Sequence, residues 1–222
     1  MQIVRRQFLR HVSAGVAGAG LARLYEVPGL FADQLALTPR QTEGPFYPTR
    51  LPLDADNDLV VVSNSTTPAL GQVTHLSGRI LTPSGSPIRN VVVEIWQVDN
   101  AGVYLHPSSA NQAARDRNFQ GFGRFETGSS GEYYFRTVKP VPYTGRTAHV
   151  HFAIKMKGRE KWTTQCYVKG ESRNDRDNVL RGIRDPRARE SLIVDFVPVK
   201  GSRVGELAAR FDVVMGFTPA DI

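Results

Sequence analysis

Short runs of β-branched and aromatic residues, separated by turn residues, dominate the chain from Thr74 onward. Such a succession is typical of a sandwich or barrel, because each run has the length of a strand and is bounded by glycine, proline or serine. The run "NVVVEIWQV" at 90–98 is almost continuously apolar, which predicts a strand buried on both faces. The other expected strands are 75–81, 123–126, 132–138, 148–156, 163–168, 191–199 and 210–217. We therefore predict an all-β sandwich of mainly antiparallel strands with long loops.

Turn and helix signals complete this expected fold. The cluster "TGSSG" at 127–131 separates two strand candidates and predicts a hairpin between them. Helical patterns are confined to the N-terminus and to 178–183 and 187–193. Before the sandwich, "TEGPFYP" at 42–48 reads as a stiff, extended arm that can lay Phe46 and Tyr47 against a surface.

The N-terminus resembles an export signal. Arg5 and Arg6 precede a Gly/Ala-rich apolar run at 12–24, the arrangement of a twin-arginine signal. This run is shorter than the about 20 residues that a membrane-spanning helix needs. We therefore expect a helical twin-arginine signal and linker at 1–32, no stable membrane span, an exported periplasmic or extracellular protein, and one sandwich domain at 33–222. An ordinary amphipathic helix is the alternative, and the cleavage point is not defined by the pattern.

Charge and cysteine usage exclude other classes of function. The formal charge is +7, but without residues 1–30 it falls to +4, and the remaining basic residues are scattered among acidic ones. We therefore expect no nucleic-acid partner. Cys166 is the only cysteine, so the chain has neither an internal disulfide nor a thiolate cluster for zinc. Any metal site must use nitrogen and oxygen donors.

The segment "YTGRTAHVHF" at 143–152 contains candidate metal ligands. In a strand, His149 and His151 project from one face, which is the geometry of a paired ligand, although two solvated imidazoles would show the same pattern. Tyr104 and Tyr143 follow strand candidates and are expected in loops, where reactive residues are common. Two tyrosines and two histidines can therefore meet at one end of the sandwich.

If these four side chains bind one ion, ferric iron is the natural candidate. A phenol with a pKa of about 10 needs a strong nearby positive charge to ionise at neutral pH, and a hard trivalent cation supplies it. Fe(III), two phenolates and one hydroxide sum to zero charge, which avoids burying a net charge. A catechol that arrives with two protons preserves this neutrality, since it can give them to the hydroxide and to one phenolate. Neutrality therefore indicates a catechol-type substrate.

Five blocks of sequence resemble the intradiol ring-cleavage dioxygenases, the family that includes protocatechuate 3,4-dioxygenase and catechol 1,2-dioxygenase. The blocks are "GPFYP", "WQVDNAGVY", "TVKPVPY", "RTAHVHF" and "TQCYV", in the family's order. The similarity runs from about Thr42 to about Val168 and more loosely to the end. It implies a β-sandwich that holds mononuclear non-haem Fe(III), with Tyr104, Tyr143, His149 and His151 as the protein ligands.

The resemblance also implies roles in catalysis. Tyr143 and His151 would be the axial ligands, and Tyr143 would leave the metal when the substrate binds. Arg146 would stabilise the carbanionic form of the substrate that O₂ attacks. Gln165 would orient Arg146 or hydrogen-bond an intermediate, or it is a buried strand residue that satisfies backbone groups. The implied reaction inserts both atoms of O₂ between the hydroxyl-bearing carbons and gives a cis,cis-muconate-type diacid without an external reductant.

The chain departs from the better-known members of the family. Thr144 follows the tyrosine where they carry a tryptophan in a longer loop. We also expect no sizeable helical N-terminal region of the kind through which catechol 1,2-dioxygenases dimerise. The sequence leaves open a homo-oligomer and the identity of the diphenol. His75 and His106 match no ligand position. Two other functions stay open: an exported transthyretin-like or carbohydrate-binding sandwich without redox chemistry, and a hydrolase that uses Zn²⁺ or Fe²⁺.

Overall fold

A computed structural model describes residues 34–63 and 65–216 of the chain. The predicted export signal, residues 1–32, lies outside the described residues. No helix in the described ranges combines the length and apolar character needed to cross a bilayer.

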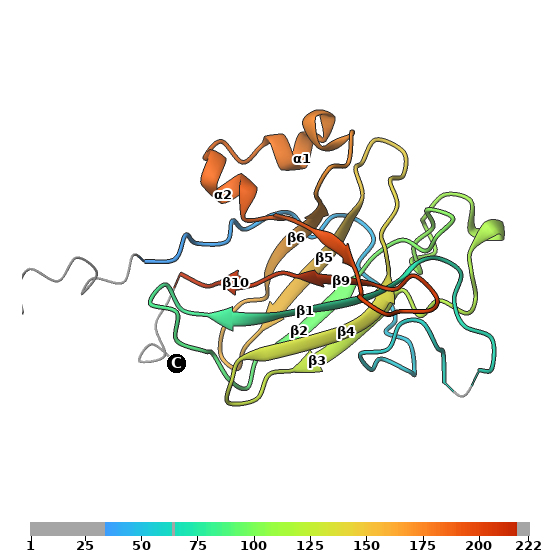
Figure 1. Ribbon diagram of the computed structural model, residues 1–222, viewed down its shortest axis with the longest axis horizontal. Coiled ribbons are helices and arrows are strands. Elements are labelled where there is room, and N and C mark those ends of the chain that lie inside the picture. The colour runs from blue at the N-terminus through green and yellow to red at the C-terminus, as the bar shows by residue number, and fades with distance from the viewer. Residues whose placement is uncertain (1–33, 64, 217–222) are drawn as a thin grey trace, which may run out of the picture. The chain divides into compact units, whose positions relative to one another are not determined.

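Ten strands of the described chain form two sheets, as the all-β prediction requires (Figure 1). The first sheet contains β1 (Val73–Leu81), β4 (Glu132–Val138), β8 (Phe196–Pro198), β9 (Leu207–Arg210) and β10 (Val213–Val214). The second has the order β3 (Phe122–Glu126), β2 (Val92–Trp96), β5 (His149–Lys155), β6 (Trp162–Val168) and β7 (Ile193–Val194). The pairs β1–β4, β2–β3, β2–β5, β5–β6 and β8–β9 are antiparallel, whereas β1–β9, β1–β10 and β6–β7 are parallel. The sandwich is therefore mainly antiparallel.

The predicted hairpin at 127–131 is wrong. β3 pairs with β2 and β4 pairs with β1, so the turn carries the chain from one sheet to the other. Gly131, with φ +67°, passes so close to β1 that a Cβ would lie 2.7 Å from the carbonyl oxygen of Ile80. The crossing lets both strands turn apolar residues toward the shared core, since Phe125 and Phe135 contact each other edge-on with ring centroids 6.3 Å apart. The residues at 127–131 do form a turn, but turn residues do not determine which strands pair.

Two further predicted strands are each replaced in the structure by two shorter strands. The run 191–199 divides into β7 and β8, which belong to different sheets, and the run 210–217 is replaced by β9 and β10 on either side of Phe211. Both helical predictions between β6 and β7 are confirmed by α1 (Asn178–Arg181) and α2 (Pro186–Glu190). Asp177 and Asp185 cap these helices by accepting hydrogen bonds from their first backbone N–H groups. Two short 3₁₀ helices, η2 (Gln112–Ala114) and η3 (Asn174–Arg176), lie in loops.

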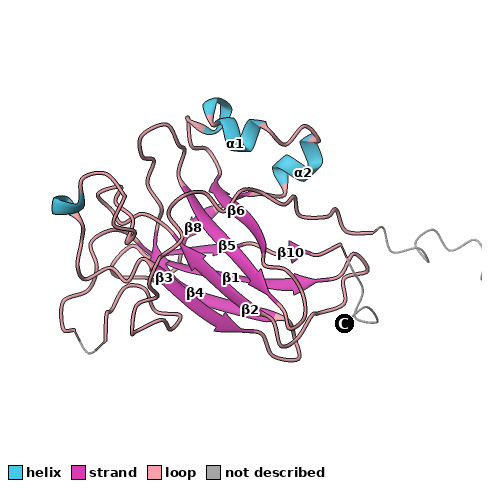
Figure 2. Cartoon of the chain, turned by 180° about the vertical axis from the view of Figure 1, so that it is seen from behind, coloured by secondary structure: helices cyan, strands magenta, loops and turns pink. Residues whose placement is uncertain are grey.

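The two faces of the second sheet have different roles. Val93, Ile95, Val150 and Phe152 face the first sheet in the main apolar core, where burial also raises the pKa of the Cys166 thiol. Trp96, Tyr104, Phe122 and Ala153 form a second cluster on the opposite face, and the arm that carries Phe46 and Tyr47 packs against it. The strand β2 is thus buried on both faces, as its sequence predicts. Figure 2 shows the helices α1 and α2 beyond the β6 edge, away from β3.

Candidate metal centre

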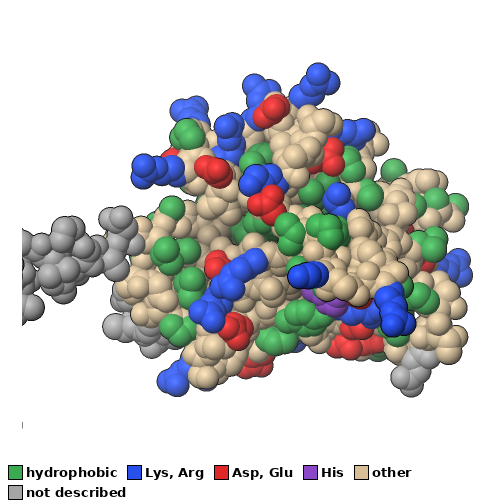
Figure 3. Space-filling view, viewed as in Figure 1, with side chains coloured by type: hydrophobic (Ala, Val, Ile, Leu, Met, Phe, Trp, Pro, Cys, Tyr) green, Lys and Arg blue, Asp and Glu red, His purple; other side chains and the backbone are tan. Residues whose placement is uncertain are grey.

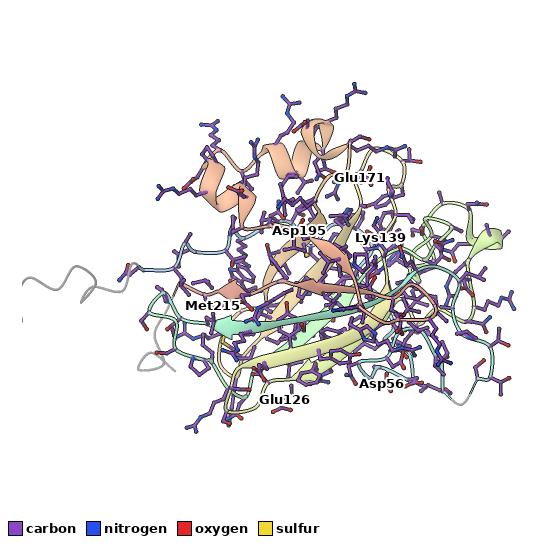
Figure 4. The ribbon with its side chains drawn as sticks, in the orientation of Figure 1. Asp56, Glu126, Lys139, Glu171, Asp195 and Met215 are labelled. Atoms are coloured by element: carbon purple, nitrogen blue, oxygen red, sulfur yellow. The ribbon has the colours of Figure 1, made fainter. Side chains whose placement is uncertain are left out.

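Loops from both sheets deliver side chains to one end of the sandwich. Figure 4 labels Met215, which follows β10, and Lys139, which follows β4. They mark opposite ends of the first sheet, because Val214 pairs with the last residue of β1 and Val138 with the first. The loop after β2 carries Tyr104, and the loop between β4 and β5 leads from Lys139 to Tyr143. Both tyrosines therefore reach the Lys139 end, where β5 begins with His149.

The four predicted ligands come together there. The phenol oxygen of Tyr104 lies 3.3 Å from that of Tyr143, 3.4 Å from Nε2 of His149 and 3.1 Å from Nε2 of His151. The two Nε2 atoms are 3.1 Å apart. Donor atoms bound to one first-row metal ion at about 2.1 Å lie about 3.0 to 3.4 Å from one another, so these separations fit a single ion.

The ionisation of the donors also fits a bound cation. Burial and the charge of Arg146 lower the pKa of His149 to about 3, and burial and His149 keep that of His151 well below its usual range. Both imidazoles are therefore neutral at pH 7. Burial and the neighbouring Tyr143 raise the pKa of Tyr104 well above its usual value. Tyr104 can ionise only beside a strong positive charge, as the sequence argument for a trivalent ion requires.

The two histidines are oriented in different ways. Nδ1 of His149 donates to the backbone carbonyl oxygen of Thr147 at 2.6 Å, which leaves its Nε2 free to act as a donor to metal. Nδ1 of His151 is buried and has no hydrogen-bond partner among the described residues. Its ring instead stacks on Trp96, with centroids 4.8 Å apart and planes 10° apart. Gly44 packs against the edge of the same ring, since a Cβ there would lie 3.4 Å from Cε1.

The arm predicted from "TEGPFYP" closes over the centre. Phe46 stacks on Tyr104, with ring centroids 4.7 Å apart and planes 25° apart. Tyr47 meets Trp96 edge-on at 5.1 Å. The arm thus covers one phenol and supports the indole that orients His151.

A buried carboxylate anchors this arm, and the sequence reasoning missed it. Glu94 is 1% exposed and lies in a run that reads as apolar. Its Oε2 accepts from the phenol of Tyr47 at 2.9 Å, and its Oε1 accepts from Nζ of Lys155 at 2.7 Å. Lys155 also donates to the phenol oxygen of Tyr47 at 3.1 Å. The three groups satisfy one another, so the charge of Glu94 is compensated at the base of the arm.

Arg146 and Gln165 are also joined at the site. Nη2 of Arg146 donates to Oε1 of Gln165 at 2.6 Å, and Nε donates to Asp177 at 2.8 Å. Although burial acts to lower the pKa of Arg146, the pair with Asp177 raises it overall, so the guanidinium stays charged. Gln165 also accepts from the phenol of Tyr167 at 3.0 Å and donates to the carbonyl oxygen of Thr42 at 3.0 Å. Gln165 thereby orients Arg146 and ties it to the start of the arm.

A tight turn links Tyr143 to Arg146. The N–H of Arg146 donates to the carbonyl oxygen of Tyr143 at 3.0 Å, and Gly145 has φ +78°, which suits the third residue of a type II turn.

Among the described residues, the two other histidines are not part of the donor cluster, although the ring of His106 lies 5.9 Å from that of Phe46. His75 contacts the phenol of Tyr134 at 2.6 Å and Glu206 at 3.4 Å, and His106 accepts from the N–H of Ser108. Within the described residues, no three side chains of His, Cys, Asp or Glu are grouped so that they could hold a metal ion. The tyrosines are therefore an essential part of the donor set.

Comparisons with known proteins identify the family. A family model described as dioxygenase matches residues 42–216, which begins where the sequence resemblance begins and extends well beyond Val168. The protocatechuate 3,4-dioxygenase beta chain of Burkholderia cepacia is 34% identical over 173 residues, covering 74% of this chain and 72% of the relative. Catechol 1,2-dioxygenase 1 of Acinetobacter lwoffii is 31% identical over 179 residues, covering 70% and 55%. The chain therefore matches little more than half the length of the catechol dioxygenase.

Solved structures share the fold. The dioxygenase domain of a dioxygenase and carbohydrate-binding protein fusion from Streptomyces sp. SirexAA-E matches with a TM-score of 0.61 and 29% identity, covering 82% of this chain and 100% of that one. An intradiol ring-cleavage dioxygenase from Tetranychus urticae matches with a TM-score of 0.64 over 82% of this chain and 95% of that one. At 19% identity, the second comparison bears on the fold alone.

Proposed function

This chain belongs to the intradiol ring-cleavage dioxygenase family, and we propose that its four-donor centre holds one ferric ion with which the protein cleaves a catechol-type diol. The substrate would be cut between its two hydroxyl-bearing carbons with O₂. The product would be a cis,cis-muconate-type diacid that contains both oxygen atoms.

One observation carries this proposal. The phenol oxygen of Tyr104 and the Nε2 atoms of His149 and His151 lie 3.1 to 3.4 Å from one another, and the phenol of Tyr143 is 3.3 Å from that of Tyr104. Two oxygen and two nitrogen donors suit ferric iron, whereas divalent zinc in hydrolases is held by thiolate, imidazole or carboxylate. A sandwich that only binds a ligand has no need to gather these groups.

The residues of the site have distinct tasks. A ferric ion held by these four donors would supply the positive charge that ionises the phenols and draws electron density from the substrate. Tyr143 is less buried than Tyr104, so its phenol oxygen accepts one of the two protons that a catechol releases on binding. Arg146 keeps its charge beside the ring and stabilises negative charge that develops on the ring carbons. Phe46 and Trp96 shield the centre from water.

Oxygen consumption tests the proposal directly. Purified protein loaded with Fe(III) is mixed with catechol, 3,4-dihydroxybenzoate and hydroxyquinol while oxygen uptake and ring-opened product are measured. We expect one O₂ per diol with no added reductant, and a severe loss of turnover in Tyr104→Phe. If no diphenol is consumed by the iron-loaded protein, the proposal fails and the ligand-binding sandwich becomes the better explanation.

We also propose export through residues 1–32, which the Arg5-Arg6 pattern supports. A reporter that folds before export, fused to residues 1–32, should reach the periplasm in a bacterium with a twin-arginine pathway. It should stay in the cytoplasm when Arg5 and Arg6 are both changed to Lys.

A further inference from the structure

A cavity of about 420 Å³ adjoins the turn between Tyr143 and Arg146. Its lining includes Thr144, Gly145, Arg146, Arg173, Arg176 and Asp177. The cavity lies between that turn and the segment that leads from β6 into α1, and Figures 1 and 2 both show these two segments on the same side of the second sheet. Its volume is within the usual range for sites that bind small molecules.

The cavity carries positive charge that its own carboxylate does not balance. Both carboxylate oxygens of Asp177 already accept hydrogen bonds, from Nε of Arg146 and from the backbone N–H groups of Thr147 and Val179. Within the described residues, the side chain of Arg173 makes one hydrogen bond, from Nη1 to the carbonyl oxygen of Tyr143 at 3.4 Å.

Arg173 and Arg176 form no ion pair with any carboxylate in the described chain. Asp175 lies between them in η3 but does not line the cavity. Figure 3 shows further Lys and Arg side chains over the α1 and α2 region, with Asp and Glu side chains among them.

The cavity borders the catalytic end of the molecule, although none of the four donor residues lines it. Arg146 lines it and also donates to Gln165 at the site. Tyr143 connects the two regions, since its phenol faces Tyr104 while its carbonyl oxygen faces Arg173. Thr144 is small, and a Cβ added at Gly145 would meet no atom within 4 Å. A substituent on a bound ring therefore has room to extend along this turn.

We propose that this cavity is an anion subsite, in which Arg173 and Arg176 bind an acidic group on the side chain of a catechol substrate. The two arginines are exposed while Arg146 is largely buried, so the acidic group would lie at the solvent end of the cavity, a few bonds from the ring. This inference rests on the proposed dioxygenase function, because the diol must bind at the neighbouring centre.

The test uses two compounds that differ in charge and hardly in size, 3-(3,4-dihydroxyphenyl)propionate and its amide. Oxygen uptake gives kcat/KM for each, and anaerobic titration of the visible absorption of the iron-loaded protein gives the Kd of each. We expect the acid to be favoured about five- to twentyfold in both measurements, the size expected for two partly exposed charge contacts. The preference should shrink in 0.5 M salt.

Variants identify the residues responsible. Arg173→Gln and Arg176→Gln should each lower the acid-to-amide ratio, and the double variant should bring it close to one, mainly by lowering kcat/KM for the acid. Arg187→Gln removes an exposed charge of the same kind from α2, outside the cavity lining, and should leave the ratio unaltered.

Two outcomes overturn the inference without touching the proposed function. One is a wild-type ratio near one with both compounds consumed, and the other is a ratio that the double variant leaves intact. Failure of the wild-type protein to consume either compound, or catechol itself, would instead count against the dioxygenase function.

Discussion

The indole ring of Trp96 lies parallel to the imidazole ring of His151, 4.8 Å from it. In metal sites, a histidine ligand usually donates its second ring nitrogen to an acceptor that fixes its orientation. Nδ1 of His151 has no such partner in the described chain, whereas Nδ1 of His149 has the carbonyl oxygen of Thr147. Stacking on Trp96 therefore takes the place of a hydrogen bond for one of the two imidazoles.

Removing this stacking surface should weaken the metal site. We expect Trp96→Leu to lower the affinity of the site for Fe(III) or Ga(III) about ten- to hundredfold, as loss of an orienting group does in other metal sites. Trp96→Phe keeps an aromatic face and should restore most of the affinity. Competition with a chelator measures the affinity, and circular dichroism of the apo-protein establishes that both variants are folded. Equal affinity in folded Trp96→Leu would show that stacking does not orient His151.

The anchor of the arm should contribute measurably to stability. In the metal-free protein, we expect Glu94→Gln to lower the free energy of unfolding by about 1 to 3 kcal/mol, because Lys155 and Tyr47 lose a charged acceptor in a largely buried place. Tyr47→Phe should cost less, since its ring still packs on Trp96. Urea unfolding measures both. Lys169→Gln is the matched control, because it breaks an exposed pair with Asp195 and should change stability by less than about 0.5 kcal/mol.

Two phenolates bound to ferric iron should colour the protein. We expect the iron-loaded protein to be burgundy to red-brown, and Tyr104→Phe to bleach or shift its visible band. Tyr134→Phe makes the same chemical change at a tyrosine that contacts His75, away from the centre, and should leave the spectrum unchanged. A colourless protein with one zinc ion per chain, indifferent to Tyr104→Phe, would contradict both the metal and the ligand assignment.

Arg146 should matter for turnover more than for iron. Because its guanidinium is held by Asp177 and Gln165 and is not one of the four donors, Arg146→Ala should keep the iron content. Loss of a fixed charge at the reacting ring should reduce kcat about 10²- to 10³-fold. Arg146→Lys keeps a charge but loses the planar fork that reaches both partners, so it should recover only part of the rate. Unchanged turnover in Arg146→Ala would remove this residue from the mechanism.

Sequence patterns predicted the parts of this site that depend on local periodicity. The alternation of a strand places His149 and His151 on one face, and the prolines around Phe46 predict a stiff arm. The pairing of strands that are distant along the chain could not be predicted from the sequence. The turn at 127–131 has hairpin chemistry, yet its two strands enter different sheets because each must cover the core from its own side.

Glu94 shows the same limit at the level of one residue. It lies in a run that is apolar on both sides, and its partners are 47 and 61 residues away along the chain. No local pattern indicates that these groups meet. The role of Asp177 at the site could not be predicted either. Its helix-capping position can be read from the sequence, but its ion pair with Arg146 cannot.

Asp177 should make the stability of the protein depend on pH in acid. Burial acts to raise the pKa of this carboxyl, but the hydrogen bond from Arg146 and those from backbone N–H groups hold it below its ordinary value overall. The native state therefore binds a proton at Asp177 less readily than the unfolded chain does. Its contribution to stability is complete above the ordinary pKa of about 4 and is lost as the pH falls through the lower native value.

Asp177→Asn keeps the shape of the side chain but cannot ionise. In urea unfolding of the apo-protein, we expect the wild type to exceed this variant in stability at pH 6 and the difference to narrow steadily below pH 4. A difference that is constant between pH 6 and pH 3 would mean that the charge of Asp177 does not support the native state.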